Sequence, residues 1–222
     1  MKEEHFATLR RHMVEVILIY VDLAGEELGK SVLDERVLAA MGRVPRHAFV
    51  PPPLAAHAYQ SVPLPIGFDK TMSQPFIVAV MTDLLEPRPD DTVLEIGTGL
   101  GYQAAVLGQL VCRVWSVEII EELAAEAEER LRRLGYDNIG IRIGDGSLGW
   151  GEHAPYDKII VTAAAELAPP ALIQQLKPGG RMVLPTGSAE EQKLTVVEKD
   201  AAGRSHLREL MSVRFGLLET VR

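Results

Sequence analysis

The sequence predicts an α/β fold: a doubly wound, mostly parallel sheet with an N-terminal helical extension. From about residue 76, short apolar β-rich runs alternate with helical stretches, which is typical of a parallel sheet covered on both faces. Before that point, seven of the 14 prolines lie within residues 45–75 and exclude long helices there. We therefore expect one domain, residues 1–222, in which residues 1–75 form a helical and proline-rich cover and residues 76–222 form the core.

The composition narrows the class of protein. The chain has 222 residues, of which 47% are hydrophobic, enough for a packed core, and its net charge is −8. Proteins that hold nucleic acid by its phosphates need clustered Lys and Arg, so we expect no nucleic-acid partner. The apolar run Val16–Val21 is too short to span a bilayer, and Glu3 and Glu4 do not fit a signal peptide. With a single cysteine, Cys112, which we expect to be buried, the sequence predicts a cytoplasmic protein without membrane association or internal disulfides.

In the N-terminal part, apolar residues between Leu33 and Met41 recur every three or four positions, which predicts an amphipathic helix. Residues 76–85 are expected to form another helix, preceded by Ser73-Gln74-Pro75. The segment 16–23 is unusually apolar, and an extra apolar face there would suit burial against a second subunit. The sequence leaves the oligomeric state open.

In the core, each predicted strand is bounded by a turn or a helix. Pro178-Gly179-Gly180 is expected to stop a helix, and Gly203 to mark a turn between the last two strands. The predicted strands are 93–96, 114–117, 139–143, 158–162, 181–184, 193–198 and 207–215. The predicted helices are 103–110, 119–134 and 170–176.

The most informative motif is the glycine loop Gly97-Thr98-Gly99-Leu100-Gly101, between a strand and a helix. Ligands of open α/β sheets bind at the carboxyl edge of the strands, so this loop is a candidate site. Nicotinamide enzymes favour G-x-G-x-x-G, whereas the spacing here is G-x-G-x-G after an acidic Glu95. An acid at this point disfavours a pyrophosphate and suits a ligand with an amino group and a sulfonium.

Two further strand ends carry acids. Glu118 follows Gly99 by 19 residues, where a carboxylate can accept hydrogen bonds from ribose hydroxyls. Asp145-Gly146 follows the next strand and can present a carboxylate to the exocyclic amine of adenine. Each feature alone is also compatible with an ordinary turn or a solvated strand end. Their order in one alternating pattern favours S-adenosyl-L-methionine over a dinucleotide.

Other motifs do not indicate a site. Residues 25–31 superficially resemble a phosphate-binding loop but have three residues between the glycines where four are needed. The six histidines show no close metal-ligand spacing, and we expect no metal site.

Several segments together resemble the protein-L-isoaspartate O-methyltransferase family, over residues from about 33 to 185. The segments Val44 to Pro51 (VPRHAFVP) and Thr71 to Pro75 (TMSQP) are the most specific to that family. The other matching segments are Pro63–Gly67, Val93–Tyr102, Gly144–Gly146, Pro155–Ala164 and Leu176–Gly180.

The resemblance implies a Rossmann-like methyltransferase that takes the methyl group from S-adenosyl-L-methionine and leaves S-adenosyl-L-homocysteine. The implied substrate is the free carboxylate of L-isoaspartyl residues in damaged proteins and peptides, whose methyl ester leads to a succinimide and to repair. The residue matching Ser73 is the active-site serine of the family. The loop Thr71 to Gln74, which we call the active loop, lies over the methyl donor in that family. The cofactor-binding residues expected from the motifs and the resemblance are Thr71, Gln74, Glu95, Gly97, Thr98, Gly99, Glu118, Asp145 and Gly146.

The chemistry suits these residue types. A carboxylic acid with a pKa near 3.9 is ionised at neutral pH, so methyl transfer to it requires alignment and desolvation more than acid–base catalysis. A hydroxyl such as that of Ser73 can donate a hydrogen bond to one carboxylate oxygen while the other attacks. The alternative for Ser73 is a capping role at the following helix.

The chain departs from the family pattern in three places: the apolar 16–32 segment, Gly67 to Lys70 before the active loop, and Gly216 to Leu218 after Val213-Arg214-Phe215. These departures leave two alternatives: a methyltransferase dedicated to another peptide or small-molecule carboxylate, and a non-catalytic adenosyl-binding module. A nicotinamide-dependent reductase is disfavoured by the spacing of the glycines.

Overall fold

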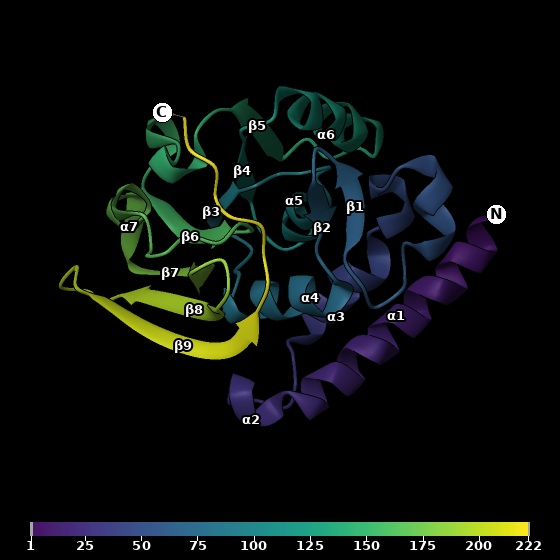
Figure 1. Cartoon of the computed structure of the whole chain (residues 1–222), viewed down its shortest axis with the longest axis horizontal. Helices are drawn as coiled ribbons and strands as arrows, with labels where there is room; N and C mark the ends of the chain where they lie inside the picture. Colours follow the sequence, from purple (N-terminus) through teal and green to yellow (C-terminus); the bar gives the residue numbers. More distant parts are fainter. Residues whose placement is uncertain (1, 222) are drawn as a thin grey trace.

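A seven-stranded sheet forms the centre of the computed structural model, which describes residues 2–221 (Figure 1). Its strand order is β5-β4-β3-β6-β7-β8-β9. The strands are β3 (Thr92–Ile96), β4 (Arg113–Glu118), β5 (Ile139–Ile143), β6 (Tyr156–Val161), β7 (Leu176–Gly187), β8 (Gln192–Lys199) and β9 (Ser205–Val213). The first five in spatial order run parallel, and β8 is antiparallel to β7 and β9. The chain moves from β3 outward to β5 and then returns to β6 on the other side of β3, which creates the switch point expected of a doubly wound sheet.

Helices and short turns surround the sheet. The helices are α1 (Glu3–Leu23), α2 (Gly25–Leu28), α3 (Glu35–Arg43), α4 (Pro75–Leu84), α5 (Tyr102–Gly108), α6 (Glu121–Arg133) and α7 (Pro170–Gln175). The 3-10 turns are η1 (Arg46–Phe49), η2 (Pro52–His57), η3 (Gly146–Leu148) and η4 (Gly151–His153). The predicted α/β class is confirmed. Strand boundaries within the parallel part differ from the prediction by at most two residues, except at β7.

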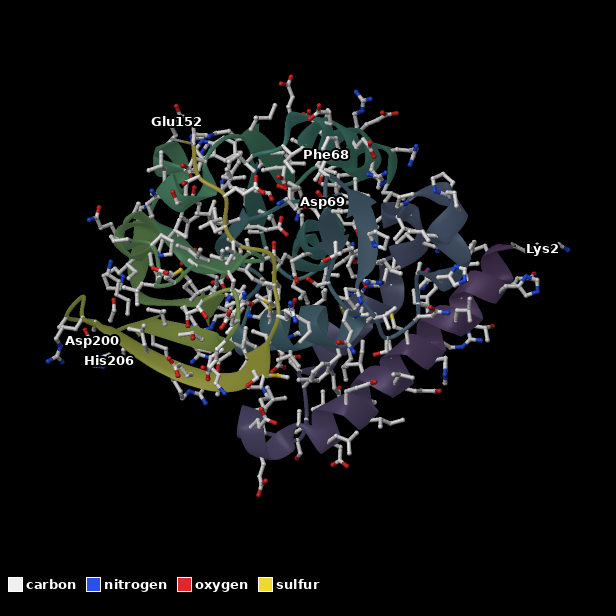
Figure 2. All side chains as sticks on the ribbon, viewed as in Figure 1. Lys2, Phe68, Asp69, Glu152, Asp200 and His206 are labelled. Atoms are coloured by element: carbon white, nitrogen blue, oxygen red, sulfur yellow. The ribbon has the colours of Figure 1, made fainter. Side chains whose placement is uncertain are left out.

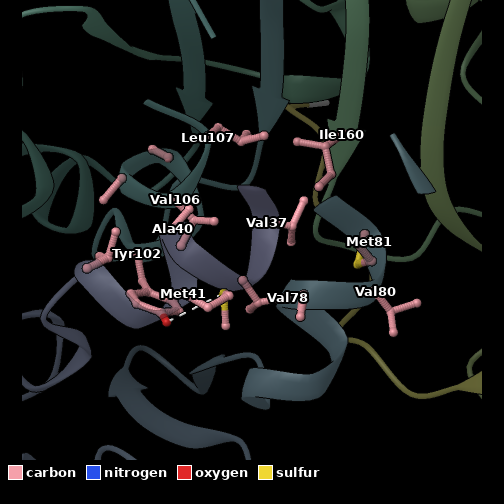
Figure 3. Packing of buried hydrophobic residues seen from close by; sticks show 14 of the residues in the cluster. Val37, Ala40, Met41, Val78, Val80, Met81, Tyr102, Val106, Leu107 and Ile160 are labelled. Atoms are coloured by element: carbon pink, nitrogen blue, oxygen red, sulfur yellow. Dashed lines mark hydrogen bonds between the residues drawn. The ribbon is translucent and has the colours of Figure 1, made fainter. Parts of the chain in front are cut away.

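Buried apolar side chains form two clusters, which share the strands of the sheet. Val93 of β3 belongs to the larger cluster and its neighbour Leu94 to the smaller, as expected from alternation along a strand. Figure 3 shows part of the larger cluster, where side chains of α3, α4 and α5 meet Ile160 of β6. The smaller cluster includes Leu172 of α7. Both faces of the parallel strands are therefore covered.

The N-terminal cover joins the core through α1, which packs against α3 and α4. Its buried residues, Phe6, Met13, Ile17 and Val21, recur along one face, whereas Leu23 is 75% exposed. The proline-rich segment 45–75 contains η1, η2 and a short hairpin, β1 (Leu64–Gly67) with β2 (Lys70–Met72), before α4 begins at its last proline. The expectation that no long helix forms there is confirmed.

Two expectations were wrong. β7 begins at Leu176, directly after α7, and not at residue 181. Leu176 pairs with Tyr156 and Arg181 with Lys158, so the Pro-Gly-Gly segment bulges out of a continuing strand. Cys112 is exposed in the bend between α5 and β4, because its neighbours Leu110 and Val111 take the buried positions.

Among residues 2–221, no helix is long and apolar enough to cross a membrane.

Candidate active site

A cavity of about 820 Å³ lies at the carboxyl edge of the parallel strands. Its floor includes the ends of three strands, at Ile96, Glu118 and Thr162. Residues from the β1–β2 hairpin and the start of α4 form a second wall, and residues 211–219 form a third. The cavity therefore lies where the fold places ligands, between the N-terminal cover and the core.

The glycine loop takes the backbone shape that its sequence requires. Gly97 has φ +93°, and a Cβ there would lie 2.4 Å from Thr162 Oγ1, so only glycine fits. Thr162 Oγ1 donates a hydrogen bond to the Gly97 carbonyl at 2.7 Å, which ties the loop to the end of β6. Gly97 and Gly99 both line the cavity.

Glu118 lies in the cavity wall with its carboxylate held by main-chain amides. Oε2 accepts from Gly99 N at 2.8 Å, and Oε1 accepts from Ile119 N and Ile120 N at 2.9 and 3.0 Å. A carboxylate has about four acceptor positions, so these three bonds fix the group and leave capacity for a ligand hydroxyl. Glu118 therefore joins the glycine loop to the end of β4 and faces the cavity.

Glu95 lies beneath the loop and does not line the cavity. Its side chain is fully buried, and Ser116 Oγ, itself 2.6 Å from Thr98 Oγ1, donates to Oε2. Burial, with a smaller effect of the Glu118 charge, raises the pKa of Glu95 to about 8, although the Ser116 hydrogen bond opposes the shift. At neutral pH the carboxyl is therefore mostly protonated. The expected direct contact of an anionic Glu95 with a ligand amino group does not fit this placement, because the strand turns the side chain into the core.

Asp145 and Gly146 occupy the third strand end, where Gly146 lines the cavity and Asp145 caps η3 beside it. Asp145 Oδ1 accepts from Ser147 N and Oγ at 2.9 and 2.6 Å, and Oδ2 accepts from Val221 N at 2.9 Å. Burial opposes ionisation, but these hydrogen bonds lower the pKa of Asp145 below its usual value. The carboxylate is thus anionic and is held by main-chain and side-chain donors of Ser147 and by the main chain of Val221.

The active loop brings Ser73, Thr71 and Gln74 to the cavity. Helix α4 starts at Pro75 with Gln74 at the N-cap position and no side-chain cap bond. The capping alternative for Ser73 is therefore not realised. Gln74 Nε2 donates to Ser61 Oγ at 2.9 Å, which anchors the loop to the cover.

Arg46 belongs to the segment Val44 to Pro51 that carries the family resemblance, and no separate role was expected for it. In the structure its side chain holds the main chain of the active loop. It is fully buried; Nη2 donates to the Ser73 carbonyl at 2.6 Å and Nε to the Ala58 carbonyl at 2.7 Å. Its guanidinium lies 4.7 Å from the centre of the Tyr102 ring. Arg46 and Ser73 are 27 residues apart, so no local pattern in the sequence points to this contact.

Residues 214–221, which we call the C-terminal strap, cross in front of the sheet (Figure 1). Ala164 N donates to the Gly216 carbonyl at 2.8 Å, and Leu218 N donates to the Ala164 carbonyl at 2.7 Å. Glu219 forms an ion pair with Lys70 of β2. The strap therefore bridges the end of β6 and the hairpin, whose turn carries Phe68 and Asp69 (Figure 2).

The charges of the lining favour a cation. The cavity is lined by four acids, Glu27, Asp69, Glu118 and Glu219, against two bases, Lys70 and Arg214. Neither base belongs to the glycine loop or to the ends of β3 and β4, where a dinucleotide would place its pyrophosphate. Within residues 2–221, no group of three His, Cys, Asp or Glu side chains could hold a metal ion.

Seven of the ten residues expected at the site line the cavity: Thr71, Ser73, Gln74, Gly97, Gly99, Glu118 and Gly146. The other three, Glu95, Thr98 and Asp145, lie beneath or beside it. The expected residues thus gather at one place: seven line the cavity, and three lie directly behind its wall. Sequence reasoning missed the β1–β2 hairpin, the contact of Arg46 with Ser73 and the particular contacts of the strap.

Comparisons with known proteins place the chain beside one family. The family model described as protein-L-isoaspartate(D-aspartate) O-methyltransferase matches residues 23–220. Protein-L-isoaspartate O-methyltransferase 1 of Polaromonas sp. is 58% identical over 99% of this chain and 93% of its own length. Protein-L-isoaspartate O-methyltransferase 2 of Syntrophobacter fumaroxidans is 53% identical over 96% of this chain and 87% of its own.

Solved structures share the fold. One solved protein-L-isoaspartate O-methyltransferase gives a TM-score of 0.78 at 27% identity, covering 92% of this chain, which spans 65% of the solved chain. A Plasmodium falciparum structure in complex with S-adenosyl-L-homocysteine gives a TM-score of 0.75 at 21% identity and covers 93% of this chain and 98% of its own. At that identity the second likeness shows the fold alone.

Proposed function

The chain belongs to the protein-L-isoaspartate(D-aspartate) O-methyltransferase family, and on that premise we propose how its cavity performs the reaction. The enzyme transfers the methyl group of S-adenosyl-L-methionine to the free carboxylate of L-isoaspartyl residues in damaged proteins and peptides. The resulting methyl ester closes to a succinimide, which starts repair. The observation that carries the proposal is one cavity lined by Gly97, Gly99 and Glu118 on the core side and by Ser73 on the cover side.

The cofactor supplies a methyl group on a positively charged sulfur when it is bound. On the core side, we propose that the main chain of Gly97 and Gly99 contacts its amino-acid part and that Glu118 accepts from its ribose hydroxyls. Gly146 and Asp145 are placed for adenine, and Thr71 and Gln74 close over the donor. Thr98 and the protonated Glu95 support the loop from beneath, as the hydrogen bonds through Ser116 indicate.

On the cover side, Ser73 is the proposed catalytic residue. Its hydroxyl donates to one oxygen of the isoaspartyl carboxylate and leaves the other oxygen free to attack. The carboxylate needs no base, because it is ionised at neutral pH. Alignment of two reactants is worth up to about 7–11 kcal/mol, so the residues that fix the geometry contribute most. Arg46 serves this alignment as a positioning residue through the Ser73 carbonyl.

We also propose that residues 1–222 act as one domain, since the cavity has walls from both the cover and the core. The net charge of −8 and the single cysteine support a cytoplasmic enzyme whose partners are isoaspartyl proteins and peptides and not nucleic acids.

The test uses labelled S-adenosyl-L-methionine and two peptides that differ only in isoaspartate against aspartate at one position. We expect methyl transfer to the isoaspartyl peptide alone, together with saturable binding of S-adenosyl-L-homocysteine and none of NADH. Binding without transfer to either peptide would indicate the adenosyl-binding module. Transfer to an unrelated carboxylate alone would indicate the dedicated methyltransferase.

A further inference from the structure

One wall of the active-site cavity has no role in the methyl transfer described above. It is formed at the junction of α1 and α2, and its residues, which we call the α1–α2 wall, are Tyr20, Leu23, Ala24 and Glu27. Helix α2 lies beside β9, near the point where the C-terminal strap begins (Figure 1). The wall therefore belongs to the same cavity as Ser73 and Glu118 but to a segment that none of the proposed contacts uses.

The α1–α2 wall lies on the acceptor side of the cavity. The Tyr20 ring lies against the Phe76 ring, with centroids 5.5 Å apart. Phe76 also lines the cavity, in the first turn of α4, three residues after Ser73. The cofactor contacts proposed for the core side come from the glycine loop and from the ends of β4 and β5. The wall is therefore placed to contact the peptide that carries the reacting carboxylate.

The wall presents large apolar side chains that the fold itself leaves uncovered. Leu23 is 75% exposed and Tyr20 is 39% exposed, and both line the cavity. The half-buried side chains of Ile77, Met211 and Val213 add apolar surface to the same lining. Apolar surface that borders a binding cavity is typical of a site that receives an apolar group.

The wall is held in place by contacts with α4. Asp83 of α4 accepts a hydrogen bond from Asp34 N at 2.7 Å and forms an ion pair with Lys30, just after α2. Leu28 of α2 is 2% exposed and belongs to the larger core cluster. A wall fixed in this way loses little conformational freedom when a ligand binds, so more of the contact energy contributes to affinity.

We propose that the α1–α2 wall is a subsite for a residue next to the isoaspartyl residue and that it selects a large apolar side chain there. The inference rests on the proposed function, because it assigns the wall to the peptide substrate. Contact with Leu23 and Tyr20 removes apolar surface of both partners from water. The wall lies in segment 16–32, where the chain departs from the family pattern, so the family resemblance alone does not predict this preference.

The experiment compares two isoaspartyl peptides that are identical except that both neighbours of the isoaspartyl residue are leucine in one and serine in the other. For the wild type, we expect kcat/KM for methyl transfer to be at least about tenfold higher with the leucine peptide, the low end of the discrimination that an apolar contact provides. The difference should lie in KM, because the reacting groups are the same. Leu23→Ser and Tyr20→Ser should each lower the leucine-to-serine ratio by about fivefold or more.

The matched control is Ile19→Ser. Ile19 lies on the same helix and is 59% exposed but, within residues 2–221, is not part of the cavity lining. This variant should keep the wild-type ratio, and calorimetry with S-adenosyl-L-homocysteine checks that every variant retains its cofactor site.

Three results would overturn the subsite while methyl transfer to isoaspartate stands. They are a wild-type ratio near one, a ratio unchanged in both Leu23→Ser and Tyr20→Ser, and an equal loss of the ratio in Ile19→Ser. If the wild type methylates neither isoaspartyl peptide, the proposed function is wrong, and the subsite is overturned with it.

Discussion

Ser73 gains its position from main-chain contacts and not from its own side chain. Its carbonyl is held by the buried Arg46, and the following residues start α4. The hydroxyl has no partner among the described side chains and lines the cavity. Because the main chain holds Ser73 in place, removal of its hydroxyl should leave the conformation of the active loop unchanged.

Ser73→Ala is therefore expected to lower kcat for an isoaspartyl peptide by about 10- to 100-fold, the value of one hydrogen bond to a charged group. The dissociation constant for S-adenosyl-L-homocysteine should change less than about threefold, because the cofactor side is intact. Steady-state methyl transfer and calorimetry measure the two quantities, with Ser205→Ala on β9 as the control. An unchanged kcat would show that Ser73 only shapes the loop.

Glu95 makes folding dependent on pH. An unfolded glutamate has a pKa of about 4.3, whereas burial raises the folded pKa of Glu95 to about 8. Between these values the folded state holds a proton that the unfolded state releases, so the contribution of Glu95 to the unfolding free energy falls as the pH rises. Glu95→Gln, which cannot ionise, should give a flatter dependence between about pH 5 and 8, by up to a few kcal/mol. Urea unfolding at several pH values measures this, and parallel curves for the two proteins would contradict it.

At the scale of elements, prediction succeeded where the physical signal is local. The strand that ends at Gly97 and the helix after it follow from apolar runs and three glycines, and both form as expected. β7 was harder, because the pairing of Leu176 with Tyr156 outweighs the local turn tendency of Pro178-Gly179-Gly180. Contacts between residues far apart in the sequence also limited prediction of the site. The position of the strap depends on such contacts, for example the ion pair between Lys70 and Glu219.

The C-terminal strap is expected to slow cofactor release. Removal of residues 217–222 deletes the Lys70 ion pair, one bond to Ala164 and the bond from Val221 to Asp145. We expect S-adenosyl-L-homocysteine to dissociate at least about tenfold faster, because each hydrogen bond contributes on the order of 1 kcal/mol. Glu219→Gln alone should have a smaller effect, within about fivefold, as for an exposed ion pair.

Stopped-flow displacement of S-adenosyl-L-homocysteine measures these rates, with Glu209→Gln on the exposed part of β9 as the control for lost charge. Equal dissociation rates in the truncated and full chains would show that the strap does not restrain the cofactor.

At the scale of the whole molecule, the net negative charge of the protein repels its anionic substrate. The protein carries −8 and the isoaspartyl group is an anion, so long-range attraction does not guide the encounter. Capture then depends on short-range contacts in the cavity, where Lys70 and Arg214 are the only basic residues of the lining within residues 2–221.

Salt should therefore help the reaction of acidic peptides. Between about 0.01 and 0.15 M ionic strength the Debye length shortens from about 30 to 8 Å, which screens the repulsion. We expect kcat/KM to rise with salt for an isoaspartyl peptide with acidic neighbours and to fall for one with basic neighbours. The same direction of change for both peptides would contradict the charge argument.

The most direct test of the account locates the transferred methyl group. A peptide that contains one isoaspartyl residue, one ordinary aspartate and a free C-terminus is incubated with the enzyme and S-adenosyl-L-methionine, and the product is fragmented by tandem mass spectrometry at acidic pH. We expect the methyl ester on the isoaspartyl residue alone. Methyl esters distributed among the three carboxylates, or confined to another one, would contradict it.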